Sequence, residues 1–66
     1  MSGRDLKAQA VLAGVPLYQV AAAARINPVR LSRLVNDRAI LDSVTEERIR
    51  RAIAQAATEE RHGRAD

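Results

Sequence analysis

The 66-residue chain has no Cys, Trp or Phe, and it has only one Tyr, three Gly and two Pro. Without Cys it can form no disulfide, no cysteine-ligated zinc site and no catalytic thiol. Its apolar residues are almost all aliphatic, with 13 Ala and 16 Val, Leu or Ile, so large aromatic side chains are scarce. The scarcity of Gly and Pro, the many Ala residues and the lack of β-branched alternation favour an all-α fold in one domain with a thin core.

Residues 8–24 carry no charge, so a membrane span or a signal peptide has to be considered. Gly14 and Pro16 interrupt this stretch, and Gln9 and Gln19 dilute it. We therefore expect neither kind of segment, and we expect the protein to be cytoplasmic.

Positive charge is concentrated in the first part of the chain. Residues 1–40 contain six Lys or Arg against two Asp, whereas residues 41–66 contain five Arg against six acidic residues. A basic field on one side of a protein suits a polyanion such as nucleic acid, although solvated helix surfaces have a similar composition. His62 has no second His and no Cys near it, so we expect no metal site. We also expect no cofactor and no small-molecule ligand.

Gly, Pro and Asn residues divide the sequence into four predicted helices, with at most a fifth. The first covers about residues 4–13 and ends at Gly14, and the second opens at Pro16. Asn27 caps the third, which covers residues 28–36 with Pro28 in its first position. The spacing of apolar residues places these side chains in the core of the three helices: Leu6, Ala10 and Ala13; Leu17, Val20, Ala21 and Ala24; Leu31, Leu34 and Val35.

The fourth helix is expected to follow a loop at residues 37–42. The pattern Ser43-x-x-Glu46 is a capping box, in which Ser43 would cap the helix. Its predicted core positions are Val44, Ile49, Ala52, Ile53 and Ala56. We expect the domain to cover residues 1–58 and to be followed by a charged, disordered tail at residues 59–66.

The second and third predicted helices form the pattern of a helix-turn-helix, because three residues separate them and the later helix is capped, basic and solvent-facing. The twenty residues LYQVAAAARINPVRLSRLVN, 17–36, resemble the helix-turn-helix of the Cro/phage-repressor (Xre-type) family and that of the lac repressor headpiece. The pattern's apolar or small positions are Val20, Ala21, Ala24, Ile26, Leu31 and Leu34. The resemblance extends through LSRLVND and TEERIRRAI, and the additional first helix favours the Xre-type arrangement. It implies a compact, lambda-repressor-like DNA-binding domain.

One residue departs from the family pattern. The ninth position of the window is usually Gly in a left-handed conformation, and this chain has Arg25 there. A side chain in that conformation costs about 1 kcal/mol, which the fold can tolerate.

The resemblance implies that residues 28–36 enter the major groove of DNA. Arg33, in the outward middle of this helix, is the expected base reader, because Arg donates a bidentate pair of hydrogen bonds to guanine. Pro28 and Val29 would contact bases through thymine methyl groups. The expected phosphate contacts are Tyr18, Gln19, Asn27, Arg30, Ser32, Asn36 and Arg38, with Arg4 as a further flexible candidate.

Two of these interpretations have structural alternatives. Tyr18 could equally cover the edge of the core. Arg48, Arg50 and Arg51 form a second basic cluster, but pairing of Glu47 with Arg51 at i,i+4 is the simpler explanation for it.

The sequence offers no nucleophile with a matching base and no phosphate-binding Gly-rich loop, so we expect no enzyme. It predicts a transcriptional regulator of double-stranded DNA, a repressor that binds a short inverted repeat as a homodimer. The expected dimer interface involves the fourth helix or the tail, with Ile40, Leu41 and Ala57 as exposed apolar positions. The alternative is a protein-interaction module, for example an antitoxin or a phage accessory factor that contacts RNA polymerase.

Overall fold

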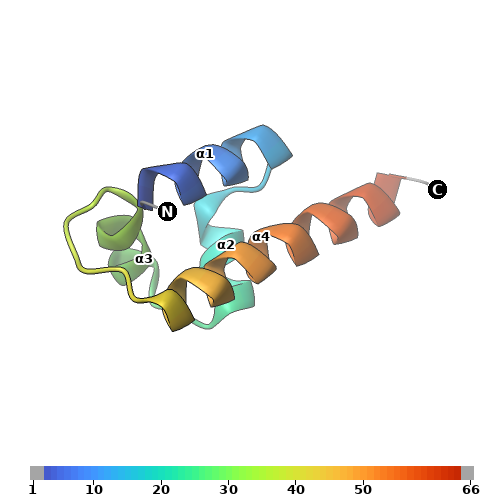
Figure 1. The fold of residues 1–66 in the computed structure, drawn as a ribbon. Helices are drawn as coiled ribbons and strands as arrows, with labels where there is room; N and C mark the ends of the chain where they lie inside the picture. Colours follow the sequence, from blue (N-terminus) through green and yellow to red (C-terminus); the bar gives the residue numbers. More distant parts are fainter. Residues whose placement is uncertain (1–2, 65–66) are drawn as a thin grey trace.

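Four helices contain most of the residues that the structure, a computed structural model, describes. The backbone is described for residues 3–64 and the side chains for residues 3–59. The helices are α1 (Gly3–Ala13), α2 (Leu17–Ala24), α3 (Pro28–Val35) and α4 (Ser43–Arg64). The shorter helices gather around the first part of α4, and the second part of α4 extends beyond them (Figure 1). The predicted all-α, four-helix fold is therefore confirmed.

Each of the three short helices ends in the same type of turn. The N–H groups of Val15, Ile26 and Arg38 donate to the carbonyl oxygens five residues earlier, at 2.9, 2.9 and 2.8 Å. The residue before each donor has a positive φ: Gly14 (71°), Arg25 (58°) and Asp37 (59°). This is the Schellman motif, which closes a helix and reverses the chain within a few residues. It explains how such short connections join α1, α2 and α3.

The core lies where α1, α2 and α3 meet one face of α4. Its largest fully buried side chains are Leu6, Val20, Leu31, Leu34, Val35 and Ile49. The six apolar or small positions of the helix-turn-helix pattern are all buried: Val20, Ala21, Ala24, Ile26, Leu31 and Leu34. The packing that the pattern predicts for α2 and α3 is therefore confirmed.

Two predicted core positions are wrong. Ala13 is exposed, and Val15, just after the helix, is buried instead. Val44 is also exposed, and its neighbour Thr45 is buried. Thr45 lies one turn before Ile49 and so shares its face, whereas Val44 is rotated from that face by about 100°.

The ends of the helices also differ from the sequence prediction. Asp42, rather than Ser43, caps α4, because its Oδ1 accepts a hydrogen bond from the Thr45 N–H at 3.3 Å. Pro16 is the N-cap of α2 and lies just before the helix. The fourth helix continues to Arg64, beyond the end of the domain predicted at residue 58.

α1 approaches α3 most closely at Gly3. A Cβ atom added to Gly3 would lie 1.9 Å from the carbonyl oxygen of Leu34 and 3.0 Å from the Cα of Val35. Only a residue without a side chain fits between the two backbones at this point. This contact places the N-terminal end of α1 against the C-terminal end of α3.

Among the described residues, no helix combines the length and the apolar character that crossing a membrane requires.

Candidate nucleic-acid interface

The start of α3 is held by the residue that the sequence predicts as its cap. The Oδ1 atom of Asn27 accepts a hydrogen bond from the Val29 N–H at 2.8 Å, and Pro28 occupies the first turn. The cap satisfies one of the free N–H groups at a helix start, and proline fixes the backbone there. The helix that resembles a recognition helix thus has a defined beginning.

The outward surface of α3 is formed by the side chains that lie opposite its buried face. Leu31, Leu34 and Val35 face the core. Val29 is 63% exposed, and Pro28, Arg30, Ser32 and Arg33 are exposed as well. The buried side chains orient the helix, and the exposed ones remain available to a ligand.

Arg30 and Arg33 provide two cations on this surface. The Arg33 guanidinium forms no hydrogen bond or ion pair with any residue whose side chain the structure describes. Arg30 lies near the Asp42 carboxylate and lowers the pKa of that group, although a hydrogen bond from Thr45 lowers it more. Arg33 is therefore the freer of the two guanidinium groups.

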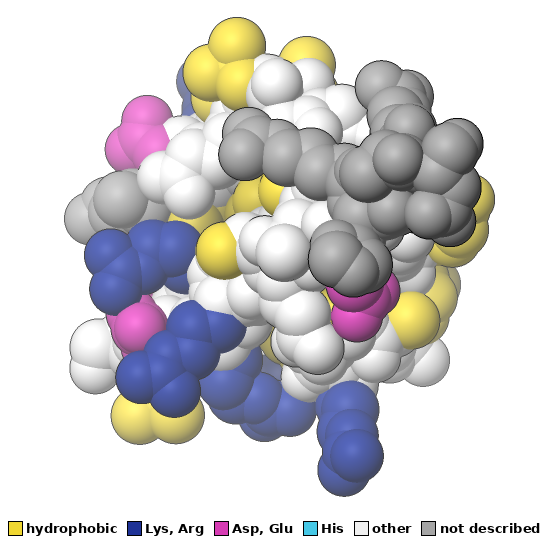
Figure 2. Space-filling view, turned by 90° about the vertical axis from the view of Figure 1, so that its right-hand side faces the viewer, with side chains coloured by type: hydrophobic (Ala, Val, Ile, Leu, Met, Phe, Trp, Pro, Cys, Tyr) yellow, Lys and Arg dark blue, Asp and Glu magenta, His cyan; other side chains and the backbone are white. Residues whose placement is uncertain are grey.

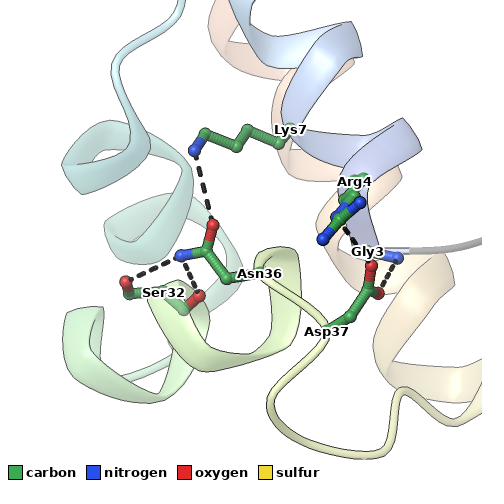
Figure 3. Close-up of polar contacts among 6 residues, drawn as sticks. All are labelled: Gly3, Arg4, Lys7, Ser32, Asn36 and Asp37. Carbon is green, nitrogen blue, oxygen red and sulfur yellow. Dashed lines mark hydrogen bonds and ion pairs between the residues drawn. The ribbon is translucent and has the colours of Figure 1, made fainter.

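The C-terminal end of α3 is joined to α1 by two sets of polar contacts (Figure 3). In the first, the Asn36 Nδ2 donates to the carbonyl oxygen of Ser32 at 2.8 Å and approaches the Ser32 Oγ at 3.4 Å. The Oδ1 of the same amide accepts a hydrogen bond from the Lys7 Nζ at 3.4 Å. Asn36 and Ser32 were predicted to contact phosphate, but in this structure they bind each other.

The second set of contacts is centred on Asp37. Its Oδ1 accepts a hydrogen bond from the Gly3 N–H at 3.1 Å, and its Oδ2 lies 3.3 Å from the Arg4 Nε. Arg4 was a candidate for a phosphate contact and is instead paired with this carboxylate. Lys7, in contrast, faces a neutral amide, so its charge is not compensated by that contact.

Lys7 is a residue that the sequence analysis missed. It lies on α1, one turn after Arg4, and it reaches Asn36 on α3. The periodicity of α1 shows that Lys7 is on the exposed face, but only the packing of α1 against α3 brings it to the candidate interface. With Arg30 and Arg33, it makes three cations on or beside α3.

The remaining predicted residues lie at the start of α2 and after α3. Tyr18 is 72% exposed, which argues against the alternative that it covers the core edge. Gln19 is half-buried and Arg38 is exposed. Arg38 follows the α3 turn, where its own N–H closes the helix.

The second basic cluster on α4 is largely paired, as the sequence predicts. Glu47 accepts a hydrogen bond from the Arg51 Nε at 3.1 Å, and it also pairs with Arg50. These contacts lower the pKa of the Glu47 carboxyl, and Arg51 has the largest effect. Lys and Arg side chains also gather on the face shown in Figure 2, which is turned away from α3, with acidic side chains among them.

Among the residues that the structure describes, no three His, Cys, Asp or Glu side chains come together as metal ligands would. The His62 side chain lies outside the described residues. Comparison of the chain with protein-family models, with curated proteins and with solved structures finds no match. The function therefore has to be inferred from the residues and their arrangement.

Proposed function

We propose that this chain binds double-stranded DNA with sequence specificity, inserts α3 into the major groove, and acts as a transcriptional regulator. The observation that carries the proposal is the arrangement of α3. It is a capped helix that is held on its buried face by Leu31, Leu34 and Val35 and presents Val29 and Arg33 to solvent. A rigid helix with exposed basic and apolar side chains matches the shape and the chemistry of the major groove.

Arg33 is the proposed base reader in this complex. It is exposed and has no polar partner among the described side chains, so both edges of its guanidinium are free to donate to guanine O6 and N7. Val29 and Pro28, exposed in the first turn, would pack against thymine methyl groups. Arg30, Arg38, Tyr18 and Gln19 remain the proposed phosphate contacts, and Lys7 now joins them.

Asn27, Ser32 and Asn36 have a different role in this proposal. Their polar atoms are used within the protein, where Asn27 caps α3 and the other two stabilise its last turn. These three side chains would hold α3 in position. Any contact that they make with phosphate would use N–H or O–H groups that are not already bonded within the protein.

The proposed form on DNA is a homodimer on a short inverted repeat, acting as a repressor. One helix reads only a few base pairs, and useful affinity normally requires two modules on half-sites about 34 Å apart. The apolar side chains exposed for a second copy are Val11, Leu12, Val44 and Ile40, the last being 96% exposed. Leu41 and Ala57 are partly buried against the core, so they contribute less to an interface than the sequence suggests.

Selection from a random pool of duplex DNA tests the proposal. The parent chain, Arg33→Ala and Arg50→Ala are compared at near-physiological salt; Arg50 lies on α4, and its replacement changes the net charge equally. The parent and Arg50→Ala should enrich the same inverted repeat. Arg33→Ala should lose discrimination at the position that Arg33 reads, by about 1–3 kcal/mol.

The DNA selection can also contradict the proposal. If no sequence is enriched, and binding falls steeply with salt but does not depend on Arg33, the chain binds DNA only nonspecifically. The alternative of a protein-interaction module then becomes the better account. Sedimentation at several concentrations, with and without the selected DNA, tests the dimer, and a monomer under all conditions would contradict it.

A further inference from the structure

A hollow of about 210 Å³ lies between the C-terminal end of α2 and the middle of α4. Three arginines from these two segments line it: Arg25, Arg48 and Arg51. The other lining residues are small or uncharged: Ala23, Ala24, Ala52 and Gln55. No Asp or Glu among the described residues lines the hollow, so its lining is entirely positive or neutral.

Two of the three guanidinium groups are held in place and keep free donors. The Arg48 Nη2 donates to the carbonyl oxygen of Ala24 at 2.6 Å, which fixes this side chain at the end of α2. The Arg51 Nε donates to Glu47, and this ion pair compensates part of the Arg51 charge. A guanidinium group has five N–H donors, so each arginine retains donors for a ligand.

Arg25 is the least expected of the three. It has no hydrogen bond or ion pair with any described side chain, and its backbone is left-handed at φ 58° and ψ 45°. Gly14 occupies the same position in the turn after α1, where the conformation carries no penalty. A side chain kept in a disfavoured conformation, beside two like charges, indicates that the side chain has a use there.

We propose that this hollow binds a phosphate group. Arginine is the residue best suited to this ligand, because its planar fork pairs two N–H groups with two phosphate oxygens. The volume lies below the roughly 300–1,000 Å³ that accommodates drug-sized molecules, which favours a small oxyanion over a larger organic ligand. The proposal does not depend on the DNA-binding function, since no residue of α3 lines the hollow.

The phosphate could belong to a free phosphate ester or to the backbone of nucleic acid. Inorganic phosphate has the shared chemistry and serves as the probe. We would titrate it into ¹⁵N-labelled protein at constant ionic strength, with chloride as the reference anion. Saturable shifts are expected at the amides of Ala24, Arg25, Ala52 and Gln55 and at the Nε–H groups of the lining arginines.

Three variants make the test specific. Arg25→Gly keeps the turn and removes one guanidinium, and Arg51→Gln removes another; each should weaken phosphate binding by about tenfold, a loss of one charge-assisted contact. Arg50→Gln changes the net charge equally but lies outside the hollow, and should bind like the parent. Circular dichroism of each variant establishes that it is folded.

The proposal is overturned if the shifts are absent or spread over the surface, or if Arg50→Gln loses as much affinity as Arg25→Gly. It is also overturned if an oligoglutamate peptide, but not phosphate, shifts the lining residues, since the hollow would then be a protein contact. When phosphate binds as expected, binding of mixed-sequence duplex DNA by Arg25→Gly identifies the source. If the number of counterions released on DNA binding falls by about one in Arg25→Gly, the phosphate belongs to the DNA backbone. If that number is unchanged, the ligand is a free phosphate ester.

Discussion

Replacing Arg25 by Gly should make the protein more stable, although it removes a complete side chain. The residue has φ 58° and ψ 45°, a conformation that costs a non-glycine residue about 1–2 kcal/mol. Its side chain is exposed and has no polar partner among the described residues, so little is lost with it. Glycine gives the unfolded chain more freedom, which offsets about 0.4–1 kcal/mol.

The net expectation for Arg25→Gly is a stabilisation of about 0.5–1 kcal/mol. For a domain of this size, that corresponds to an increase of about 2–8 °C in the melting temperature. Thermal and urea unfolding followed by circular dichroism at 222 nm measure both quantities. Gly14→Ala is the reverse experiment, because φ is 71° there and an added Cβ meets no heavy atom within 4 Å. It should lose about 1 kcal/mol through the backbone conformation alone.

Arg25→Ala separates the backbone effect from the charge. Alanine also lacks the guanidinium, but it keeps the cost of the left-handed conformation, so its stability should stay near that of the parent. If Arg25→Ala stabilises as much as Arg25→Gly, repulsion from Arg48 and Arg51 is the cause and the reasoning from φ is refuted. An unchanged or lower stability of Arg25→Gly would refute it as well.

Three other substitutions or conditions have defined outcomes. Gly3→Ala should destabilise the protein by about 1–3 kcal/mol and more than Gly14→Ala does, because its Cβ would overlap the Leu34 carbonyl oxygen; urea unfolding compares the two. Asn27→Ala should cost about 1 kcal/mol through the lost cap of α3, and if α3 reads DNA it should weaken binding in gel-shift titrations without changing the preferred sequence. Acid should destabilise the fold: the Asp42 and Glu47 carboxyls have pKa values below their ordinary 3.8 and 4.5, so their contribution is present above those values and is lost as the pH falls through the lowered ones. Urea midpoints measured from about pH 6 to about pH 2 should fall less steeply for Asp42→Asn and Glu47→Gln than for the parent.

The parts of the fold that the sequence predicts well are determined by neighbouring residues. The Asn27-Pro28 pair fixes the start of α3, and the spacing of Leu31, Leu34 and Val35 identifies its buried face. Both signals act within one or two turns of a helix, so they do not depend on how the helices pack. The outward surface, with Arg33 and Val29, follows from the same periodicity.

The errors arise where two local signals compete. Asp42 and Ser43 are both good helix caps, and the Ser43-x-x-Glu46 pattern favours the later one, whereas the structure uses Asp42. Val44 is more apolar than Thr45, but the position of Ile49 requires the residue one turn earlier to be buried. Composition favours Val44 and geometry selects Thr45, because the remaining core positions of α4 already fix the face.

Contacts between α1 and α3 could not be predicted from the sequence. The link from Lys7 to Asn36 and the approach of Gly3 to Leu34 join residues about 30 positions apart. Their existence depends on the angle at which α1 crosses α3, which no local pattern encodes. The sequence therefore identifies the exposed face of α3 but not the cation that α1 adds beside it.

The three helix-closing turns show when a left-handed residue other than Gly is informative. The turn at Gly14 forms without a side chain, and a Cβ added there would meet no heavy atom within 4 Å. Asp37 has the same conformation, and its carboxylate binds the Gly3 N–H and lies beside the Arg4 Nε, which ties α1 to α3. Asp37 thus compensates for its backbone cost within the fold. Arg25 incurs the same cost without a polar partner among the described residues, and the fold tolerates it. A ligand in the arginine-lined hollow would provide such a partner, and for this reason a more stable Arg25→Gly protein that binds phosphate about tenfold more weakly would connect the strained turn to function.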